Sequence, residues 1–199
     1  MTRTLTVVSH THWDREWYQP FQEYRLRLVQ LIDRLLDLLD GEPAYRCFTL
    51  DGQTILLEDY LEVRPYRREK LQDYVQQGRL QIGPWYILPD EFLVSPEATI
   101  RNLILGDRVA RQFGPKMQVG YIPDSFGHVS QLPQILRGFG LDTAVTWRGI
   151  GPAPNEFRWI GADGTDVLAI HLRGGYGNAA FLPYDEAHFT NQLDQLVAR

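Results

Sequence analysis

Apolar residues along the chain alternate between short runs typical of buried strands and longer stretches with helical spacing. The clearest helical stretch is Phe21–Leu39, where apolar residues recur every three or four positions and Gly41 is placed to end the helix. The short runs are rich in β-branched and aromatic residues. We therefore expect strands at Thr4–Val8, Tyr45–Leu50, Leu80–Gly83, Trp85–Leu88, Met117–Ile122, Thr143–Trp147, Phe157–Ile160 and Val167–Leu172. Further helices are expected at residues 54–77 with a break near Pro65, and at 95–113, 131–137 and 184–199.

This order of elements predicts the α/β class, with a mostly parallel sheet, alternating helices and a (β/α)-barrel-like arrangement. Ser95, Pro96 and Glu97 in succession are typical of a helix start. The last two predicted strands flank a Gly-Ala-Asp-Gly turn and indicate a hairpin. The final predicted helix reaches Arg199 without a stop signal. We therefore expect residues 1–199 to be cut from a larger α/β domain and to be incomplete at the C-terminus.

The amino-acid composition excludes several classes of protein. A hydrophobic fraction of 44% excludes a disordered chain, and the single Cys47 excludes a disulfide framework or a multi-cysteine zinc module. A net charge of -5 without a basic block argues against nucleic-acid and membrane-surface partners. No apolar run approaches the roughly 20 residues that cross a bilayer, and the first residues lack a secretory signal pattern. The resulting expectation is a cytoplasmic protein.

The segment from Ser9 to Trp17 carries the densest group of candidate ligands. Side chains alternate in an extended backbone, so His10, His12 and Asp14 would share one face. Imidazole and carboxylate groups together bind zinc and similar divalent cations. The alternative is structural: one histidine is a hydrogen-bonded group in or near the core, and Asp14 pairs with Arg15 or caps a turn. A metal site would also need at least one further ligand from elsewhere in the chain.

Other polar side chains follow predicted strands, where α/β proteins place their ligands. Asp124 follows Met117–Ile122, where it can serve as a metal ligand, as a nucleophile, or as the cap of the next helix. Arg148 follows Thr143–Trp147, and its planar guanidinium can orient a carboxylate or form a structural salt bridge.

Two carboxylates and several aromatic residues suggest a sugar substrate. Asp90 and Glu91 can bind hydroxyl groups or act in acid–base catalysis, although a capping role in a loop is also open. Trp17 is a candidate platform for a pyranose ring, because aromatic faces pack well on apolar C–H patches. Burial in the core is the ordinary alternative for a tryptophan.

Several segments, in this order, resemble the glycoside hydrolase family 38 α-mannosidases, in particular the bacterial branch that includes mannosylglycerate hydrolase. They are His-Thr-His-Trp-Asp-Arg-Glu-Trp-Tyr (10–18), Leu-Asp-Gly-Gln-Thr (50–54), Gly-Pro-Trp-Tyr (83–86), Pro-Asp-Glu-Phe-Leu-Val-Ser (89–95), Ile-Arg-Asn-Leu (100–103), Pro-Asp-Ser-Phe-Gly-His (123–128) and Trp-Arg-Gly (147–149). The resemblance extends from about residue 5 to about residue 183.

The resemblance implies a retaining exo-α-mannosidase that depends on a divalent cation, usually Zn²⁺, one per active site. It implies that His12, Asp14 and Asp124 bind the cation and that Asp124 is also the catalytic nucleophile. By the same resemblance Trp17 stacks under the mannose ring and Arg148 orients Asp124. The family's general acid/base and a further metal-binding histidine lie downstream of the matching region. An N-terminal fragment of such an enzyme, inactive by itself, is therefore expected.

Two other functions stay open at this stage. A different metal-dependent hydrolase, of the carbohydrate deacetylase or amidohydrolase type, would use a metal-activated water and no covalent nucleophile. A non-catalytic sugar-binding module would need only an aromatic-lined groove. The expected partner is an α-mannoside, either an oligosaccharide or a mannosyl conjugate. An incomplete domain also exposes apolar surface, so a homo-oligomer is a possible state.

Overall fold

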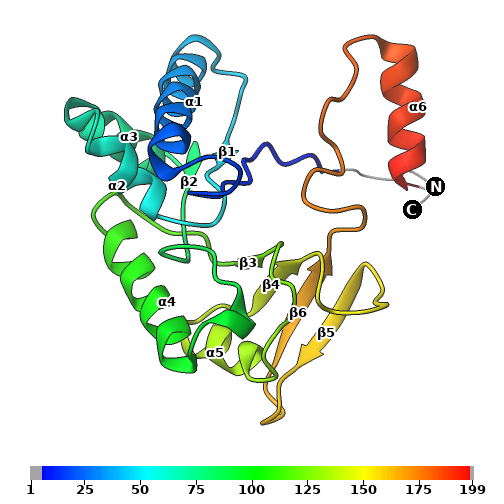
Figure 1. Ribbon diagram of the computed structural model, residues 1–199. Helices are drawn as coiled ribbons and strands as arrows, with labels where there is room; N and C mark the ends of the chain where they lie inside the picture. Colours follow the sequence, from blue (N-terminus) through cyan, green and yellow to red (C-terminus); the bar gives the residue numbers. More distant parts are fainter. Residues whose placement is uncertain (1–5, 198–199) are drawn as a thin grey trace. The chain divides into compact units, whose positions relative to one another are not determined.

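The computed structural model describes residues 6–197, which fall into two compact units. The helical unit comprises Ser9–Pro89 and Val94–Gln118. Of the described residues, the sheet unit comprises 6–8, Asp90–Leu93 and 119–197. Figure 1 follows the chain through both units and labels their helices and strands.

The helical unit is built on a short parallel pair of strands. β1 (Phe48–Thr49) pairs with β2 (Leu80–Gln81), with Phe48 opposite Leu80. The helices of this unit are α1 (Phe21–Gly41), α2 (Ile55–Leu61), η1 (Pro65–Arg67), α3 (Arg68–Gln76) and α4 (Pro96–Ala110). Their apolar faces meet in one buried cluster to which α1, α2, α3 and the end of α4 all contribute. The predicted break near Pro65 is the short helix η1 between α2 and α3.

Two features of the helical unit follow directly from local sequence. α1 has its buried residues at the predicted spacing, among them Leu28, Ile32 and Leu39. Ser95 caps α4, because its side chain accepts a hydrogen bond from the backbone N–H of Ala98 at 3.1 Å. Gly106 lets α4 approach the chain closely: a Cβ at this position would lie 2.2 Å from the carbonyl oxygen of Pro84.

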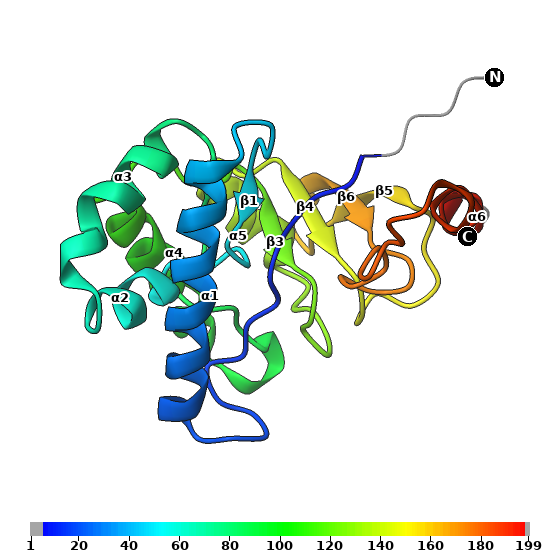
Figure 2. The same cartoon turned by 90° about the horizontal axis from the view of Figure 1, so that it is seen from above.

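The sheet unit contains four adjacent strands in the order β3-β4-β6-β5, which Figure 2 shows from above. β3 (Gly120–Ile122), β4 (Thr143–Thr146) and β6 (Asp166–His171) are parallel, and β5 (Glu156–Ile160) is antiparallel to β6. The helices of this unit are η2 (Glu91–Leu93), α5 (Leu132–Gly138) and α6 (Glu186–Val197). Leu136 of α5 packs so closely on Gly120 of β3 that a Cβ there would lie 2.7 Å away.

The α/β class and the hairpin of β5 and β6 are confirmed, but several predicted elements differ from those observed. Gly41, which was expected to terminate the helix, is the last residue of α1, so the helix extends two residues beyond Phe21–Leu39. Trp85–Leu88 is not a strand, since Trp85 forms only an isolated bridge with Gln53. The prediction for Thr4–Val8 lies partly outside the described residues, and residues 6–8 form no strand.

The described strands pair into two separate sheets, and one of these includes an antiparallel edge. A closed barrel therefore stays a prediction. Among residues 6–197, no helix combines the length and the hydrophobicity that a membrane span requires.

Candidate functional site

The segment that carries His12 and Asp14 runs along β1 in the helical unit. The backbone N–H of Thr49 donates to the carbonyl of Ser9 at 2.9 Å, and the N–H of Thr11 donates to the carbonyl of Thr49 at 3.3 Å. His10 is thereby bridged to Thr49, and its Nδ1 lies 2.7 Å from the carbonyl oxygen of Thr11. This backbone pairing thus begins about two residues after the predicted strand Thr4–Val8, and His12 follows it directly.

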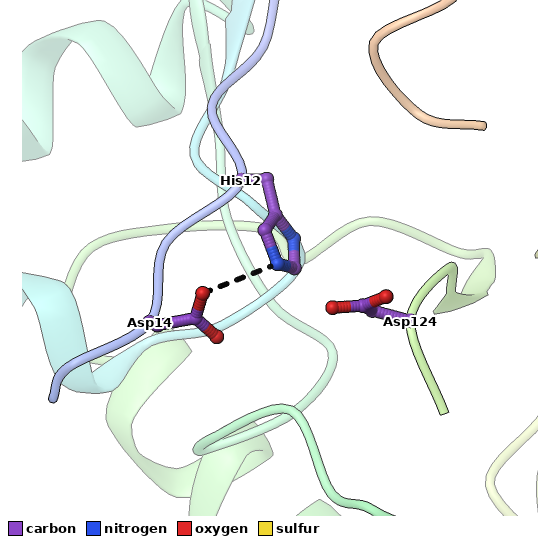
Figure 3. Close-up of side chains that lie close together, drawn as sticks. All are labelled: His12, Asp14 and Asp124. Carbon is purple, nitrogen blue, oxygen red and sulfur yellow. Dashed lines mark ion pairs between the residues drawn. The ribbon is translucent and has the colours of Figure 1, made fainter. Parts of the chain in front are cut away.

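His12 lies between two carboxylates of the same unit. Its Nε2 is 3.6 Å from Oδ2 of Asp14, and its Nδ1 is 3.7 Å from Oδ1 of Asp51. Figure 3 shows the imidazole and Asp14 turned toward each other. The side chain of His12 is 13% exposed and that of Asp14 is 46% exposed, whereas that of Asp51 is fully buried. One ring nitrogen therefore faces a buried carboxylate and the other faces a carboxylate that solvent can reach.

Asp51 is held by the turn that follows β1. Its backbone has φ +47°, and Gly52 has φ +66°, so the chain reverses tightly at this point. Its Oδ2 accepts hydrogen bonds from the backbone N–H of Trp13 at 2.5 Å and from Nε2 of Gln53 at 2.9 Å. Burial raises the pKa of the Asp51 carboxyl, and the neighbouring His12 opposes that shift. The turn therefore fixes both Asp51 and the backbone next to His12.

Gln53 and Asp59 hold the rest of this loop. The Gln53 side chain is buried and donates to the carbonyl of Trp13 at 2.8 Å. Arg15 forms two hydrogen bonds with Asp59, at 2.7 and 2.8 Å, and its guanidinium lies 4.5 Å from the centre of the Phe21 ring. Asp14 therefore does not depend on Arg15, which excludes the structural pairing that the sequence left open. Trp17 lies just beyond and is 63% exposed.

In the sheet unit, Asp124 and Arg148 follow adjacent parallel strands. Asp124 comes two residues after β3 and Arg148 two residues after β4. Nη2 of Arg148 lies 2.7 Å from Oδ1 of Asp124. This salt bridge forms at the carboxyl ends of the strands, where the predicted topology placed both side chains. Asp124 is also labelled in Figure 3.

Two aromatic rings hold the guanidinium of Arg148. Its Cζ lies 4.0 Å from the centre of the Trp147 ring and 4.7 Å from the centre of the Phe126 ring. Such contacts restrain a planar cation in orientation as well as in position. Arg148 is therefore directed at Asp124 by aromatic contacts in addition to charge.

Asp90 and Glu91 were expected to bind substrate, and in the structure both support the loop that follows Asp124. Oδ1 of Asp90 accepts a long hydrogen bond, 3.4 Å, from the backbone N–H of Phe126. Glu91 is 1% exposed, and its two oxygens contact Nδ1 of His128 at 2.7 Å and the N–H of Val129 at 3.0 Å. In this chain Glu91 therefore supports the loop, and its expected role in substrate binding stays a prediction.

The donor set of the helical unit fits a divalent cation. A metal-bound histidine typically donates its second N–H to a carboxylate, which fixes the tautomer and the ring orientation. His12 has this arrangement: Asp51 lies on the Nδ1 side, and Asp14 shares the Nε2 side. Imidazole and carboxylate ligands suit zinc, and a complete site needs ligands beyond these two.

Sequence reasoning missed the supporting residues. Asp51, Gln53 and His128 were noted only as parts of matching segments, without a role. The available signal was the Asp-Gly turn followed by glutamine, which puts polar groups next to the end of a buried strand.

Comparison with known proteins identifies the same family that the sequence motifs resemble. Residues 2–198 match the model of the glycosyl hydrolases family 38 N-terminal domain. The chain is 45% identical to a putative mannosylglycerate hydrolase of Halalkalibacterium halodurans, over 94% of this chain and 22% of that protein. It is 31% identical to the α-mannosidase of Saccharomyces cerevisiae, over 94% of this chain and 17% of that one.

Among solved structures, an α-mannosidase from Enterococcus faecalis V583 matches with a TM-score of 0.92 and 40% identity, over 96% of this chain and 22% of that chain. The chain thus spans about a fifth of the length of the relatives that it matches. Since the family model covers nearly every residue, this chain belongs to glycoside hydrolase family 38.

Proposed function

We propose that this chain forms the N-terminal portion of the catalytic domain of a retaining, metal-dependent exo-α-mannosidase. The observation that carries the proposal is the His12–Asp14 pair with Asp51 behind it, in a chain that belongs to family 38. The Asp124–Arg148 salt bridge supports the assignment of a nucleophile. The relatives named above are a putative mannosylglycerate hydrolase and α-mannosidases, which supports a terminal α-mannoside as the substrate.

In this proposal Asp124 is the nucleophile. One of its oxygens attacks the anomeric carbon while the bond from that carbon to the aglycone oxygen breaks, and an acid from elsewhere in the protein protonates the departing oxygen. Water then cleaves the mannosyl–Asp124 ester, so the anomeric configuration is retained overall. Arg148 holds one carboxylate oxygen of Asp124 and so sets the direction from which the other oxygen attacks.

His12, Asp14 and Asp124 are the residues that would hold the cation, which we propose is zinc or another divalent ion. When bound, such an ion supplies Lewis-acid binding of the sugar hydroxyls, which is worth most when the ring distorts toward the transition state. Trp17, which is exposed, is the proposed platform under the mannose ring. The remaining metal ligand and the general acid are proposed to lie beyond the 199 residues.

The experiment that tests this function uses the complete gene product with an aryl α-mannoside. We expect hydrolysis that releases the α-anomer of mannose first, as followed by proton NMR, and that is lost on chelation and restored by added zinc. A carbohydrate deacetylase would instead release acetate from N-acetylated sugars and no mannose. A sugar-binding module would bind mannose without turnover and without a metal requirement.

Asp51→Asn tests how His12 is oriented. The new amide would present its oxygen to Trp13 and Gln53 and its NH₂ to Nδ1 of His12, which would move the histidine proton to Nε2 and block that nitrogen as a ligand. We expect the zinc affinity of the chain to fall about 10- to 100-fold, as is typical for such supporting carboxylates. Competition with a chromophoric chelator measures this, and unchanged affinity would exclude the orienting role of Asp51.

A further inference from the structure

The sheet unit contains a buried ion pair that the proposed mechanism does not use. Nδ1 of His128 lies 2.7 Å from Oε1 of Glu91, and the two side chains are 4% and 0% exposed. Nε2 of the same ring lies 2.9 Å from the carbonyl oxygen of Arg148. The pair thus connects helix η2 to the backbone of the residue whose guanidinium contacts Asp124.

The partners of His128 limit the protonation states that its ring can adopt. A carbonyl oxygen only accepts hydrogen bonds, so Nε2 must donate to Arg148. The second oxygen of Glu91 accepts the N–H of Val129 at 3.0 Å, which suits an ionised carboxylate. With Glu91 ionised, Nδ1 donates to Oε1 and both ring nitrogens carry protons. With Glu91 protonated, its carboxyl would donate to Nδ1 instead, and the ring would carry one proton.

Uncharged groups of the sheet unit also lie against His128. The hydroxyl of Thr146 lies 3.2 Å from Nε2 and offers a second acceptor there. The Trp159 ring of β5 meets the imidazole edge-on, with the ring centres 4.8 Å apart. Gly149 passes so close that a Cβ there would lie 3.1 Å from the imidazole. The guanidinium of Arg148 stacks on Phe126 and Trp147, so Arg148 meets His128 through its carbonyl.

We propose that Glu91 and His128 are positioning residues, which direct Arg148 at Asp124 through an imidazole that donates a hydrogen bond from each ring nitrogen. Loss of one ring proton would leave a lone pair facing either the Arg148 carbonyl or the Glu91 carboxylate, and one of the two contacts would be lost. The loop that begins at Arg148 would then be released from its support. The effect of this release on catalysis rests on the proposed function. The number of protons on the His128 ring does not depend on that function.

Glu91→Gln separates this proposal from a merely structural role. The new amide would keep its oxygen on the N–H of Val129 and donate its NH₂ to Nδ1 of His128. The ring then needs a single proton, on Nε2, to keep its contact with Arg148. We therefore expect Glu91→Gln to preserve the position of Arg148 although the ring then carries a single proton. In His128→Ala the imidazole is absent, and Arg148 should lose its position.

The first measurement is NMR of the chain with ¹⁵N-labelled histidine and arginine. At neutral pH we expect two slowly exchanging ring protons on His128 in the wild type, one in Glu91→Gln, and an altered Nε–H signal of Arg148 only in His128→Ala. The exposed pair of Asp185 and His188, with Nδ1 2.6 Å from Oδ1, is the matched control. Asp185→Asn should leave the signals of His128 and Arg148 unchanged. A single ring proton on wild-type His128 would overturn the proposal.

The second measurement is the rate at which a fluorinated mannoside with a fluoride leaving group labels Asp124. We expect the Glu91→Gln rate to match that of the wild type and the His128→Ala rate to be lower by about 10²-fold. A His128→Ala rate equal to that of the wild type would contradict the proposal. Absence of labelling in all variants, with the NMR result intact, would instead contradict the proposed function.

Discussion

Asp124→Ala is expected to reduce the hydrolysis of an aryl α-mannoside by the complete gene product by at least about 10⁴-fold, because removing a covalent nucleophile removes the first chemical step. The exposed Asp194 of α6, in the same unit, provides the matched control, and Asp194→Asn should leave the rate unchanged. Since Asp124 is also a proposed metal ligand, the loss of rate alone does not establish the covalent role.

Covalent trapping separates these two roles of Asp124. A fluorinated mannoside with a fluoride leaving group needs little acid assistance, so the 199-residue chain can be tested alongside the complete protein. We expect the mass of one mannosyl group on the peptide that contains Asp124, and no label in Asp124→Ala. Label on a different carboxylate, or a complete protein that turns over mannosides and never labels, would show that Asp124 is not the nucleophile.

Local sequence was sufficient to predict a helix where the apolar spacing and the capping residues lie within or next to that helix. The apolar spacing of Phe21–Leu39 predicted α1, and the order Ser95, Pro96, Glu97 predicted the start of α4. Strands were predicted less well, because an extended backbone becomes a strand only when it finds a partner. Tyr45–Leu50 was expected as a strand of six residues, yet only Phe48–Thr49 pairs with β2.

In the candidate site too, residues with a local sequence signal were predicted, and residues that act through distant contacts were not. Alternation along an extended segment and position after a strand identified His12, Asp14, Asp124 and Arg148 as candidates, and the resemblance assigned their roles. The support of these residues was not predictable, because it depends on contacts between distant positions. Asp51 accepts the N–H of Trp13 across 38 residues, and Glu91 meets His128 across 37. The contact of Glu91 with His128 was missed for this reason: from sequence alone, a carboxylate next to a conspicuous motif is described equally well as a ligand or as a support.

Asp14→Ala is expected to abolish retention of a divalent cation by the chain, with an apparent affinity lower by more than about 10²-fold, since a direct ligand contributes more than a supporting carboxylate. The side chain of Asp14 is 46% exposed and lies on the Nε2 side of His12, so its removal should leave the fold intact. Zinc content after dialysis, together with chelator competition, measures the effect. Asp73→Ala, an exposed acid on α3 in the same unit, is the control.

Comparing this variant with Asp51→Asn separates binding from orientation. If His12 and Asp14 bind the cation directly and Asp51 only orients His12, then Asp14→Ala must cost more affinity than Asp51→Asn. Zinc content that is unchanged in Asp14→Ala would remove the metal from the proposed mechanism, and with it the reason to place His12 in the active site. An equal loss in both variants would mean that Asp51 contributes as much as a ligand, and the assigned donor set would then have to change.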